Sequence, residues 1–425
     1  PYSSLASEGS LAALLQDGKR VSRAEEGSQV EVILPSTGFY VESGGQVADQ
    51  GSVLALSEPK WEIQVESIKK PVQGLIVHCG TVAAGSPSEG DPAVAVVDTI
   101  RRKDIMRNHT ATHLLHASLH EVLGDHARQA GSLVAPDRLR FDFNHPQPMT
   151  QEEILTVEAR VNQAILSNHP LRITQKPLQE AIDEGATALF GEKYDAVVRT
   201  ITIGEREAFS YELCGGTHVD ETGDIGLFLI TYEGSIAAGV RRVEAVTGWG
   251  AYQHARERMN ILEETNHFLG TSPSELLPKI KSISNALASA EKTITKLQTQ
   301  QVASEFTLQL NETEEISGVT VLRAMLPEAS MDALREMADK FRQQVDSGIA
   351  VLASEQEGKP VLIAAVTEDL VKRGMHAGEL VNQVAQVVDG GGGGRPTLAQ
   401  AGGKDSSKIS EALDVVPGYI RDNLK

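Results

Sequence analysis

The chain has 425 residues, of which 40% are hydrophobic and 23% charged, so it is long enough for roughly two to four globular domains. No apolar run approaches the roughly 18 residues that a membrane span needs, and two cysteines, Cys79 and Cys214, cannot build a disulfide framework, so we expect a cytoplasmic protein without a membrane partner. The net charge of −19 argues against a protein that grips nucleic acid with its whole surface, so a nucleic-acid partner would have to meet local basic patches.

Residues 1–98 are predicted to form a small β domain. Four short apolar or alternating runs, separated by clusters of Gly, Pro and Ser, start at Gln29, Val53, Trp61 and Gly74. Several short strands at this spacing suggest a small barrel or sandwich. Gly44-Gly45 permits a positive φ and a close backbone approach, as in a loop that faces a ligand, with a plain hairpin turn as the alternative.

Residues 99–248 are predicted to form an α+β domain around one helix. The run RRKDIMRNHTATHLLHASLHEVLG (101–124) has helical periodicity, which places His109 and His113 on one face, one turn apart. A second pentad, from Cys214 to His218, contains two central glycines and is predicted to be a tight turn after a strand. Together the pentads supply three imidazoles and one thiolate, a ligand set that suits Zn²⁺.

The histidine helix has a second interpretation. His116 and His120 lie on the same helical face, so the stripe could instead be a partly exposed polar face. Thr110 stands where the helix of a zinc metalloprotease needs a glutamate, which excludes peptidase chemistry of the HExxH type. Four protein ligands would close a tetrahedral site, so spacing leaves open whether the metal is catalytic or structural.

Beyond this helix, residues 132–143 are predicted to form a strand pair. Thr150 and Glu153 form a capping-box pattern that begins a helix running through Ile165. Strands are predicted again at 197–203 and 225–231, with ELCGGTHV between them.

Residues 249–315 are predicted to be helical. Apolar residues from Leu276 keep a strict 4-3 spacing, typical of a coiled coil or helical hairpin, and this seam turns polar at Gln301 and Ser304 before it reaches Leu308. A spacer between domains is the simplest interpretation. Self-association is the alternative, as a homodimer through this helix or through the C-terminal domain.

Residues 316–425 are predicted to form a compact α/β domain with strands at 319–322, 349–353 and 360–366 and helices at 331–345 and 377–388. A run of five glycines ends at Arg395 and is predicted to be a loop whose backbone amides reach an anion. A flexible linker is the alternative, and the run lacks the Gly-Lys-Ser/Thr ending of a P-loop. The predicted fold class is thus α+β multidomain: a barrel-like β domain (1–98), an α+β domain (99–248), a helical or coiled-coil spacer (249–315) and an α/β domain (316–425).

Several of these motifs resemble the editing domain of alanyl-tRNA synthetases. The similarity is carried by the histidine helix, QAGSLV (129–134), RFDF (140–143), LFGEKYD (189–195), ELCGGTHV (212–219), GVRRVEAVTG (239–248) and the glycine-rich stretch TGFYVESGGQVADQG (37–51). The resemblance implies a Zn²⁺-dependent hydrolase that removes wrongly attached serine or glycine from alanine tRNA. It also implies that Thr112, Gln129 and Ser132 line the amino-acid pocket.

The stretch DGGGGGRPTLAQAGGKD (389–405) resembles the C-terminal domain of the same synthetases, a signature shared with DHH-type phosphoesterases. In the synthetases this domain helps to hold the tRNA, which assigns tRNA contacts to Gly391, Gly392, Gly393 and Arg395. A phosphoesterase is disfavoured because the chain has no Asp-His-His triplet.

The extent of the resemblance predicts the C-terminal half of such a synthetase. No stretch resembles the class II aminoacylation motifs, and the first residue is Pro1 rather than Met, which suggests a fragment or a processed chain. We therefore expect an editing hydrolase that lacks the aminoacylation domain. The alternative is a non-catalytic tRNA-binding or dimerisation module with structural zinc.

Overall fold

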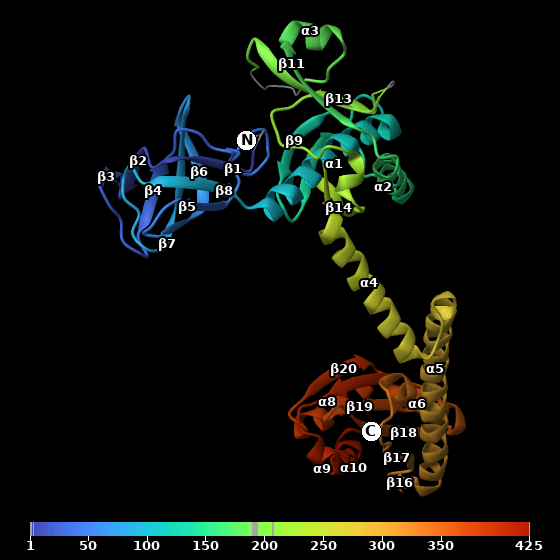
Figure 1. The fold of residues 1–425 in the computed structure, drawn as a ribbon. Helices are drawn as coiled ribbons and strands as arrows, with labels where there is room; N and C mark the ends of the chain where they lie inside the picture. The colour runs from blue at the N-terminus through green and yellow to red at the C-terminus, as the bar shows by residue number, and fades with distance from the viewer. Residues whose placement is uncertain (1, 3, 189–193, 206–207, 425) are drawn as a thin grey trace. The chain divides into compact units, whose positions relative to one another are not determined.

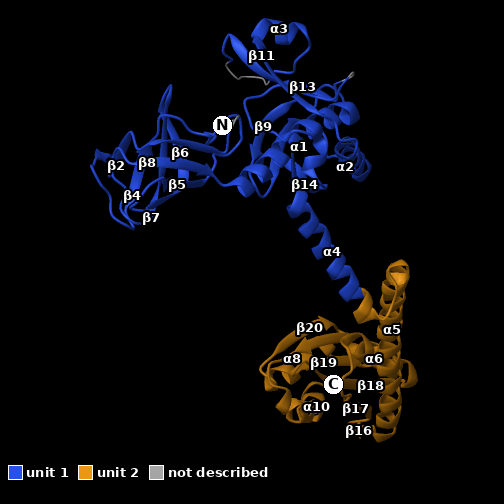
Figure 2. Cartoon of the chain, viewed as in Figure 1, with its two compact units in different colours: residues 1–265 blue, residues 266–425 orange. Residues whose placement is uncertain are grey.

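The structure is a computed structural model that describes residues 2, 4–188, 194–205 and 208–424 (Figure 1). The described residues fall into two compact units, 1–265 and 266–425, each with hydrophobic clusters of its own (Figure 2). The finer division into four parts remains a prediction. No helix in the described ranges combines the length and the apolar character that crossing a membrane requires.

The first unit begins with an antiparallel β-sheet in the strand order β1-β8-β5-β6-β7-β4-β2-β3. Its strands are β1 (Ala6–Ser10), β2 (Ala13–Gln16), β3 (Lys19–Arg20), β4 (Gln29–Ile33), β5 (Gly51–Ala55), β6 (Glu62–Val72), β7 (Leu75–Ala84) and β8 (Pro92–Val97). The four predicted strands are confirmed as β4 to β7. Their apolar side chains pack with Phe39 and Trp61 in one core.

The barrel-like closure predicted for this domain is wrong. β1 and β3 are the two ends of the sheet, and the described residues show no pairing between them. β3 consists only of Lys19 and Arg20, both exposed, and a short, charged edge strand disfavours further pairing. The spacing of short strands predicts local pairing but does not distinguish an open sheet from a closed barrel.

The rest of the first unit surrounds the helix α1 (Thr99–Leu123) and contains antiparallel sheets in the orders β14-β15-β10-β9 and β11-β12-β13. The strands are β9 (Gln129–Val134), β10 (Leu139–Asn144), β11 (Leu171–Pro177), β12 (Val197–Ile203), β13 (Ser210–Leu213), β14 (Phe228–Ala237) and β15 (Val240–Thr247). The remaining elements are α2 (Gln151–Leu166), α3 (Leu178–Asp183), the 3₁₀ turn η1 (Thr222–Ile225) and α4 (Gly248–Leu269), which runs into the second unit.

Local sequence explains where the two central helices begin. The Asp98 side chain caps α1 by accepting hydrogen bonds from the backbone amides of Ile100 and Arg101. The capping box of Thr150 and Glu153 at the start of α2 is confirmed. The strand predicted at 225–231 begins later, at Phe228, because the preceding residues form η1.

The glycine-rich loop, residues 37–50, docks the first sheet onto α1. Arg102 of α1 forms an ion pair with Asp49, and both side chains are almost fully buried. The loop turns at Gly44-Gly45, where both φ angles are positive as predicted, and then pairs with the end of β9 through backbone hydrogen bonds between Gly45, Val47 and Val134. The turn therefore also contacts the neighbouring sheet through β9, which a plain hairpin turn would not do.

Asp49→Ala should destabilise the first unit by about 3–5 kcal/mol, because it leaves the buried Arg102 guanidinium without its carboxylate. Unfolding by urea can be followed by the fluorescence of Trp61, which is buried in this unit, and the variant should unfold with its midpoint at a lower urea concentration. Asp137→Ala removes a carboxylate from an exposed pair with Arg138 and should leave the midpoint nearly unchanged. Equal midpoints for Asp49→Ala and the unmodified chain would contradict this prediction.

The second unit is a mixed sheet in the order β16-β17-β18-β19-β21-β20, with β17 and β18 parallel. Its strands are β16 (Glu314–Ile316), β17 (Val319–Met325), β18 (Gly348–Gln356), β19 (Lys359–Val366), β20 (Gly391–Arg395) and β21 (Leu398–Gly402). α5 (Leu276–Gln309) and α6 (Met331–Gln344) pack into one cluster with the sheet. α7 (Glu368–Lys372), α8 (Ala377–Val387), α9 (Ile409–Asp414) and α10 (Val416–Asn423) contribute to the other.

The long helix α5 departs from its predicted seam. The 3₁₀ turn η2 (Pro273–Glu275) directly precedes α5. Near its end, however, α5 buries Val302 and Phe306 in the core of the second unit, whereas Leu308 of the predicted seam is exposed. The predicted 4-3 seam therefore does not describe the packed face of this last part, and self-association remains a prediction.

The glycine run is an edge strand, so its prediction as a loop or a flexible linker is wrong. β20 pairs antiparallel with β21, from Gly391 opposite Gly402 to Arg395 opposite Leu398. A Cβ atom at Gly392 would lie 2.3 Å from the carbonyl oxygen of Gln400 on β21, so this approach requires glycine.

Candidate metal centre

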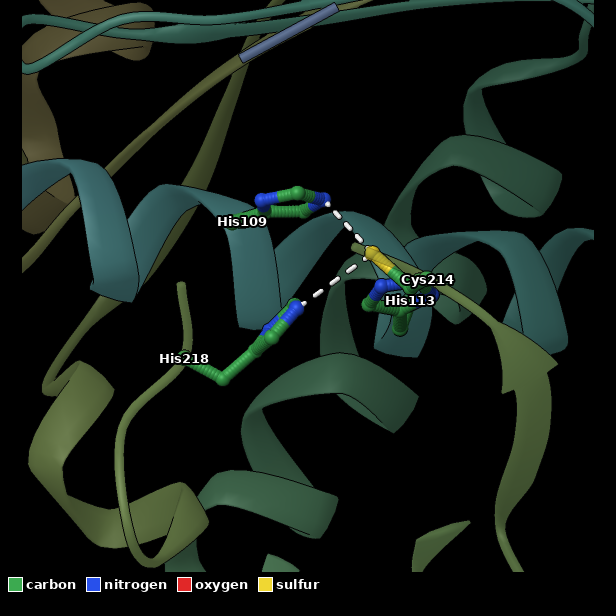
Figure 3. A group of neighbouring side chains, drawn as sticks. All are labelled: His109, His113, Cys214 and His218. Atoms are coloured by element: carbon green, nitrogen blue, oxygen red, sulfur yellow. Dashed lines mark hydrogen bonds between the residues drawn. The ribbon is translucent and has the colours of Figure 1, made fainter. Parts of the chain in front are cut away.

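α1 presents His109 and His113, and the segment after β13 returns Cys214 and His218 to them (Figure 3). One ligand-type atom from each residue lies within 4.8 Å of the others. Cys214 Sγ is 3.3 Å from His109 Nε2 and 3.4 Å from His218 Nε2. The structure therefore brings together all four residues of the two pentads in a group that could hold a metal ion.

The histidines of this group are buried, with 5% of His109, 6% of His113 and 5% of His218 exposed. The interpretation of the stripe as a partly exposed polar face is therefore wrong for the two α1 residues. His116, one turn further along α1, is buried as well.

Each of the three imidazoles is held through its Nδ1 atom by a side-chain oxygen. His109 Nδ1 lies 2.7 Å from Gln46 Oε1, His113 Nδ1 lies 2.7 Å from Glu212 Oε2, and His218 Nδ1 lies 3.2 Å from Thr110 Oγ1. Metal-binding histidines are oriented in this way, because a hydrogen bond at one ring nitrogen directs the other toward the ion.

The surroundings of the His113 Nε2 atom show whether the group fits a metal ion. This atom is buried and has no hydrogen-bond partner in the described part of the chain. A buried polar atom without a partner costs free energy, and a metal ion among these four ligand atoms would remove that cost. The donor set, three imidazoles and a thiolate, is one that Zn²⁺ accepts.

The charges of the metal-free group are set by burial and by mutual contact. Burial raises the pKa of Cys214, but the imidazoles of His109, His218 and His113 outweigh it and hold this pKa well below its usual value. Burial lowers the pKa of His113, but Glu212 and the Cys214 thiolate raise it to about 10. Burial, together with His109, lowers the pKa of His218 to about 3. Near pH 7 the group thus holds a thiolate, a protonated His113 and a neutral His218.

Metal binding should therefore release about one proton from His113 between roughly pH 7 and 9, because a ligating imidazole must be neutral. The apparent affinity should rise about tenfold per pH unit in this range and level off as the pH passes the pKa of His113 in the metal-free chain. Titration calorimetry of Zn²⁺ binding in buffers of different ionisation enthalpy measures the released protons. Glu212→Gln should reduce their number, and a count of zero for the unmodified chain would refute the assignment.

A cavity of about 90 Å³ adjoins the group, and all three residues predicted to line an amino-acid pocket, Thr112, Gln129 and Ser132, line it. The hydroxyl of Thr112 donates to the carbonyl of Asn108 at 2.8 Å, which leaves its oxygen lone pairs available to the cavity. Gln129 Nε2 lies 3.4 Å from Ser132 Oγ. Five residues of the LFGEKYD motif, 189–193, lie outside the described residues. Tyr194, which follows them in the motif, is described and lines the cavity.

Gln46 and Glu212 are functional candidates that the sequence motifs did not single out. Gln46 is fully buried; its Oε1 accepts from the Thr217 amide at 2.9 Å as well as contacting His109, so one side chain joins both pentads. Glu212 contacts both His113 and His116. Both residues lie inside quoted motifs, and a buried polar residue beside ligand residues is the signal that could have identified them.

The residues predicted to contact tRNA lie together on β20 in the second unit and are exposed. Gly393 and Arg395 line a cavity of about 470 Å³ together with Gly394 and Arg335, whereas Gly391 and Gly392 do not line it.

Comparison with known proteins agrees with these features. Residues 1–101 match a family model of class II (A) tRNA synthetases, residues 198–244 match the second additional domain of threonyl and alanyl tRNA synthetases, and residues 318–422 match the DHHA1 domain. The alanine–tRNA ligases of Pelotomaculum thermopropionicum and Geobacillus kaustophilus are both 44% identical, over 100% and 99% of this chain. This chain is homologous to alanine–tRNA ligases from end to end.

The chain spans about half the length of these relatives, 48% and 47% respectively. The resemblance to alanyl-tRNA synthetases is confirmed by these relatives. The sequence motifs alone do not indicate the match of residues 1–101 to the class II (A) model. Among solved structures, the C-Ala domain of Aquifex aeolicus alanyl-tRNA synthetase is 30% identical over 25% of this chain and 95% of that one, with a TM-score of 0.24.

Proposed function

We propose that the first unit is a Zn²⁺-dependent hydrolase that removes wrongly attached serine or glycine from alanine tRNA. The observation that carries this proposal is a buried group of three imidazoles and a thiolate beside a small polar cavity, in a chain homologous to alanine–tRNA ligases. The cavity of about 90 Å³ is lined by hydroxyl and amide side chains, including Thr112, Gln129 and Ser132, which suits a small polar substrate group.

The metal would be held by His109, His113, Cys214 and His218. Bound there, Zn²⁺ would supply a Lewis acid that polarises the ester carbonyl or orients the amino group of the substrate. Gln46 and Glu212 hold His109 and His113 through their Nδ1 atoms, so they keep the ligand nitrogens directed at the centre.

Selection of serine over alanine would come from the polar lining of the cavity. Thr112 offers oxygen lone pairs, and Gln129 and Ser132 offer an amide and a hydroxyl. An alanyl group has no hydroxyl and would leave these groups unpaired, which is how a polar site rejects an analogue by a large factor. A glycyl group lacks the hydroxyl as well, so this lining explains the removal of serine and does not explain that of glycine.

The second unit would contact the tRNA through the exposed strand β20. Arg395 and Arg335 line the same cavity, and guanidinium groups bind phosphate oxygens in a planar, bidentate manner. Gly391, Gly392 and Gly393 carry no side chains, so nothing beside their backbone amides hinders the approach of an anion.

A second candidate function is a non-catalytic tRNA-binding module with a structural metal. The number of protein ligands favours it, because four ligands close a tetrahedral site and catalytic zinc usually keeps one position open. The adjoining cavity and its hydroxyl and amide lining favour the enzyme.

The decisive experiment is hydrolysis of serine- and alanine-charged alanine tRNA by the purified chain, with zinc measured in the same sample. We expect about one zinc per chain, rapid loss of serine and little loss of alanine. Zinc without hydrolysis would favour the structural module. A chain without zinc after growth and purification in zinc would overturn the metal centre itself.

A further inference from the structure

In the segment from Cys214 to His218, the side chains of Thr217 and His218 are buried, whereas the middle of the segment has no side chain to pack. Its centre is Gly215-Gly216, and glycine restrains the backbone less than any other residue. Yet the positions of both ligand atoms depend on this backbone. What holds it in place therefore lies elsewhere in the first unit.

Side chains from outside the segment bind its three successive carbonyl groups. One terminal nitrogen of Arg199 donates to the carbonyl of Cys214 at 3.0 Å and to that of Gly216 at 2.7 Å. Between them, the Tyr2 hydroxyl donates to the carbonyl of Gly215. The segment is thus held along one side by Arg199 and Tyr2, whose hydrogen bonds go to its backbone rather than to its ligand atoms.

Arg199 is suited to this task by its position in the fold. It lies on β12, the strand between β11 and β13, so its backbone is paired on both sides. Its carbonyl also accepts a hydrogen bond from the Cys214 amide at 3.0 Å, which extends the pairing of β12 one residue past β13. The guanidinium carbon lies 4.3 Å from the centre of the Tyr2 ring, which covers one face of the guanidinium.

We propose that Arg199 is a positioning residue that fixes the segment from Cys214 to Gly216, so that Cys214 Sγ and His218 Nε2 face the imidazoles of α1. This inference rests on the proposed metal centre. Arg199 does not line the cavity beside Thr112; it lines a neighbouring cavity of about 320 Å³ with Tyr2 and His218. Its hydrogen bonds to the segment go to backbone carbonyls, so the proposed action on the ligands is through the backbone.

The test compares Co²⁺ binding by the full chain and by three variants. Arg199→Met keeps a long side chain but removes both hydrogen bonds, and Arg199→Lys keeps the charge without the planar fork. Arg172→Met is the matched control, because Arg172 is an exposed arginine on the adjacent strand β11. The readouts are the Kd for Co²⁺ and the thiolate-to-cobalt charge-transfer band, which reports how Cys214 is placed.

Arg199→Met should raise the Kd by about 10–100-fold and weaken the charge-transfer band, as changes to groups that orient ligands do. Arg199→Lys should lie between this variant and the unmodified chain, and Arg172→Met should match the latter. An unchanged Kd and band in Arg199→Met would overturn the proposal. So would a raised KM for charged tRNA with unchanged Co²⁺ binding, which would make Arg199 a substrate-binding residue.

Two further results separate this inference from the proposed function. If the unmodified chain binds no Co²⁺, the metal centre fails and the positioning role fails with it. If the chain binds Co²⁺ and Arg199→Met binds it equally well, only the positioning role fails. If circular dichroism shows that Arg199→Met does not fold, the Arg199→Lys variant becomes the test. A Co²⁺ Kd and a charge-transfer band in Arg199→Lys equal to those of the unmodified chain would then overturn the proposal.

Discussion

Cys214→Ser should abolish tight Zn²⁺ binding while leaving the fold of the first unit intact. Cys214 supplies the one thiolate of the group, and its sulfur lies within 3.4 Å of a nitrogen of both His109 and His218. A serine hydroxyl stays protonated near pH 7 and is a poor ligand beside imidazoles, whereas the surrounding histidines favour the thiolate. Zinc content should fall from about one per chain to nearly none after dialysis against a chelator.

Hydrolysis of serine-charged tRNA should fall with the zinc content, by more than about 100-fold. Mutation of residues that only hydrogen-bond to metal ligands already reduces metal affinity or activity by about 10–100-fold, and loss of a ligand should cost more. The chain offers a matched control in Cys79→Ser, since Cys79 lies on β7 outside the group and is also a free cysteine. This control should keep its zinc and its activity. A Cys214→Ser chain that retains one zinc through dialysis would rule out Cys214 as a ligand.

The parts of this site that could be predicted are those that depend on local periodicity. Helical spacing is sufficient to place His109 and His113 one turn apart. The tight turn predicted from the paired glycines is wrong, because the described segment after Cys214 has only a bend at Gly216. That the two pentads meet is a property of the tertiary fold; their complementary ligand types suggested it, and the resemblance to a known family supported it.

The residues that hold the histidines could not be predicted in the same way. Gln46 reaches His109 across 63 positions of the sequence, and Glu212 reaches His113 across 99. Neither contact leaves a periodic signal, because the partner lies on a different element and the hydrogen bond uses a side chain.

The glycine run shows a different limit of local reasoning. Glycine is depleted in strands because it gains little from packing and loses much conformational freedom, so a loop is the natural prediction. In the structure the pairing with β21 and the contacts with α8 outweigh that preference. Tertiary context decides the conformation of a segment whose own residues favour none.

Gly216→Ala should disrupt the metal centre almost as strongly as the loss of a ligand, by displacing His109 or the segment after β13. A Cβ atom at Gly216 would lie 1.9 Å from His109 Cε1, 2.3 Å from its Nδ1 and 2.8 Å from Gln46 Oε1. Real Cβ atoms do not approach this closely, so the imidazole of His109 or the backbone of Gly216 must shift, and either shift disturbs the contacts among His109, Gln46 and the segment after β13. We expect the Kd for Zn²⁺, measured by competition with a chelator, to rise by about 100-fold.

The neighbouring glycine makes this prediction specific. A Cβ atom at Gly215 would meet nothing within 4 Å, so Gly215→Ala should bind Zn²⁺ as the unmodified chain does. Both variants change the flexibility of the segment by the same chemical step, and only one of them touches a histidine. If both variants lost zinc equally, flexibility of the segment would be the cause, and the packing of Gly216 against His109 would not be what shapes the site. If only Gly216→Ala loses it, the close approach of Gly216 to His109 seen here is required for the metal to bind.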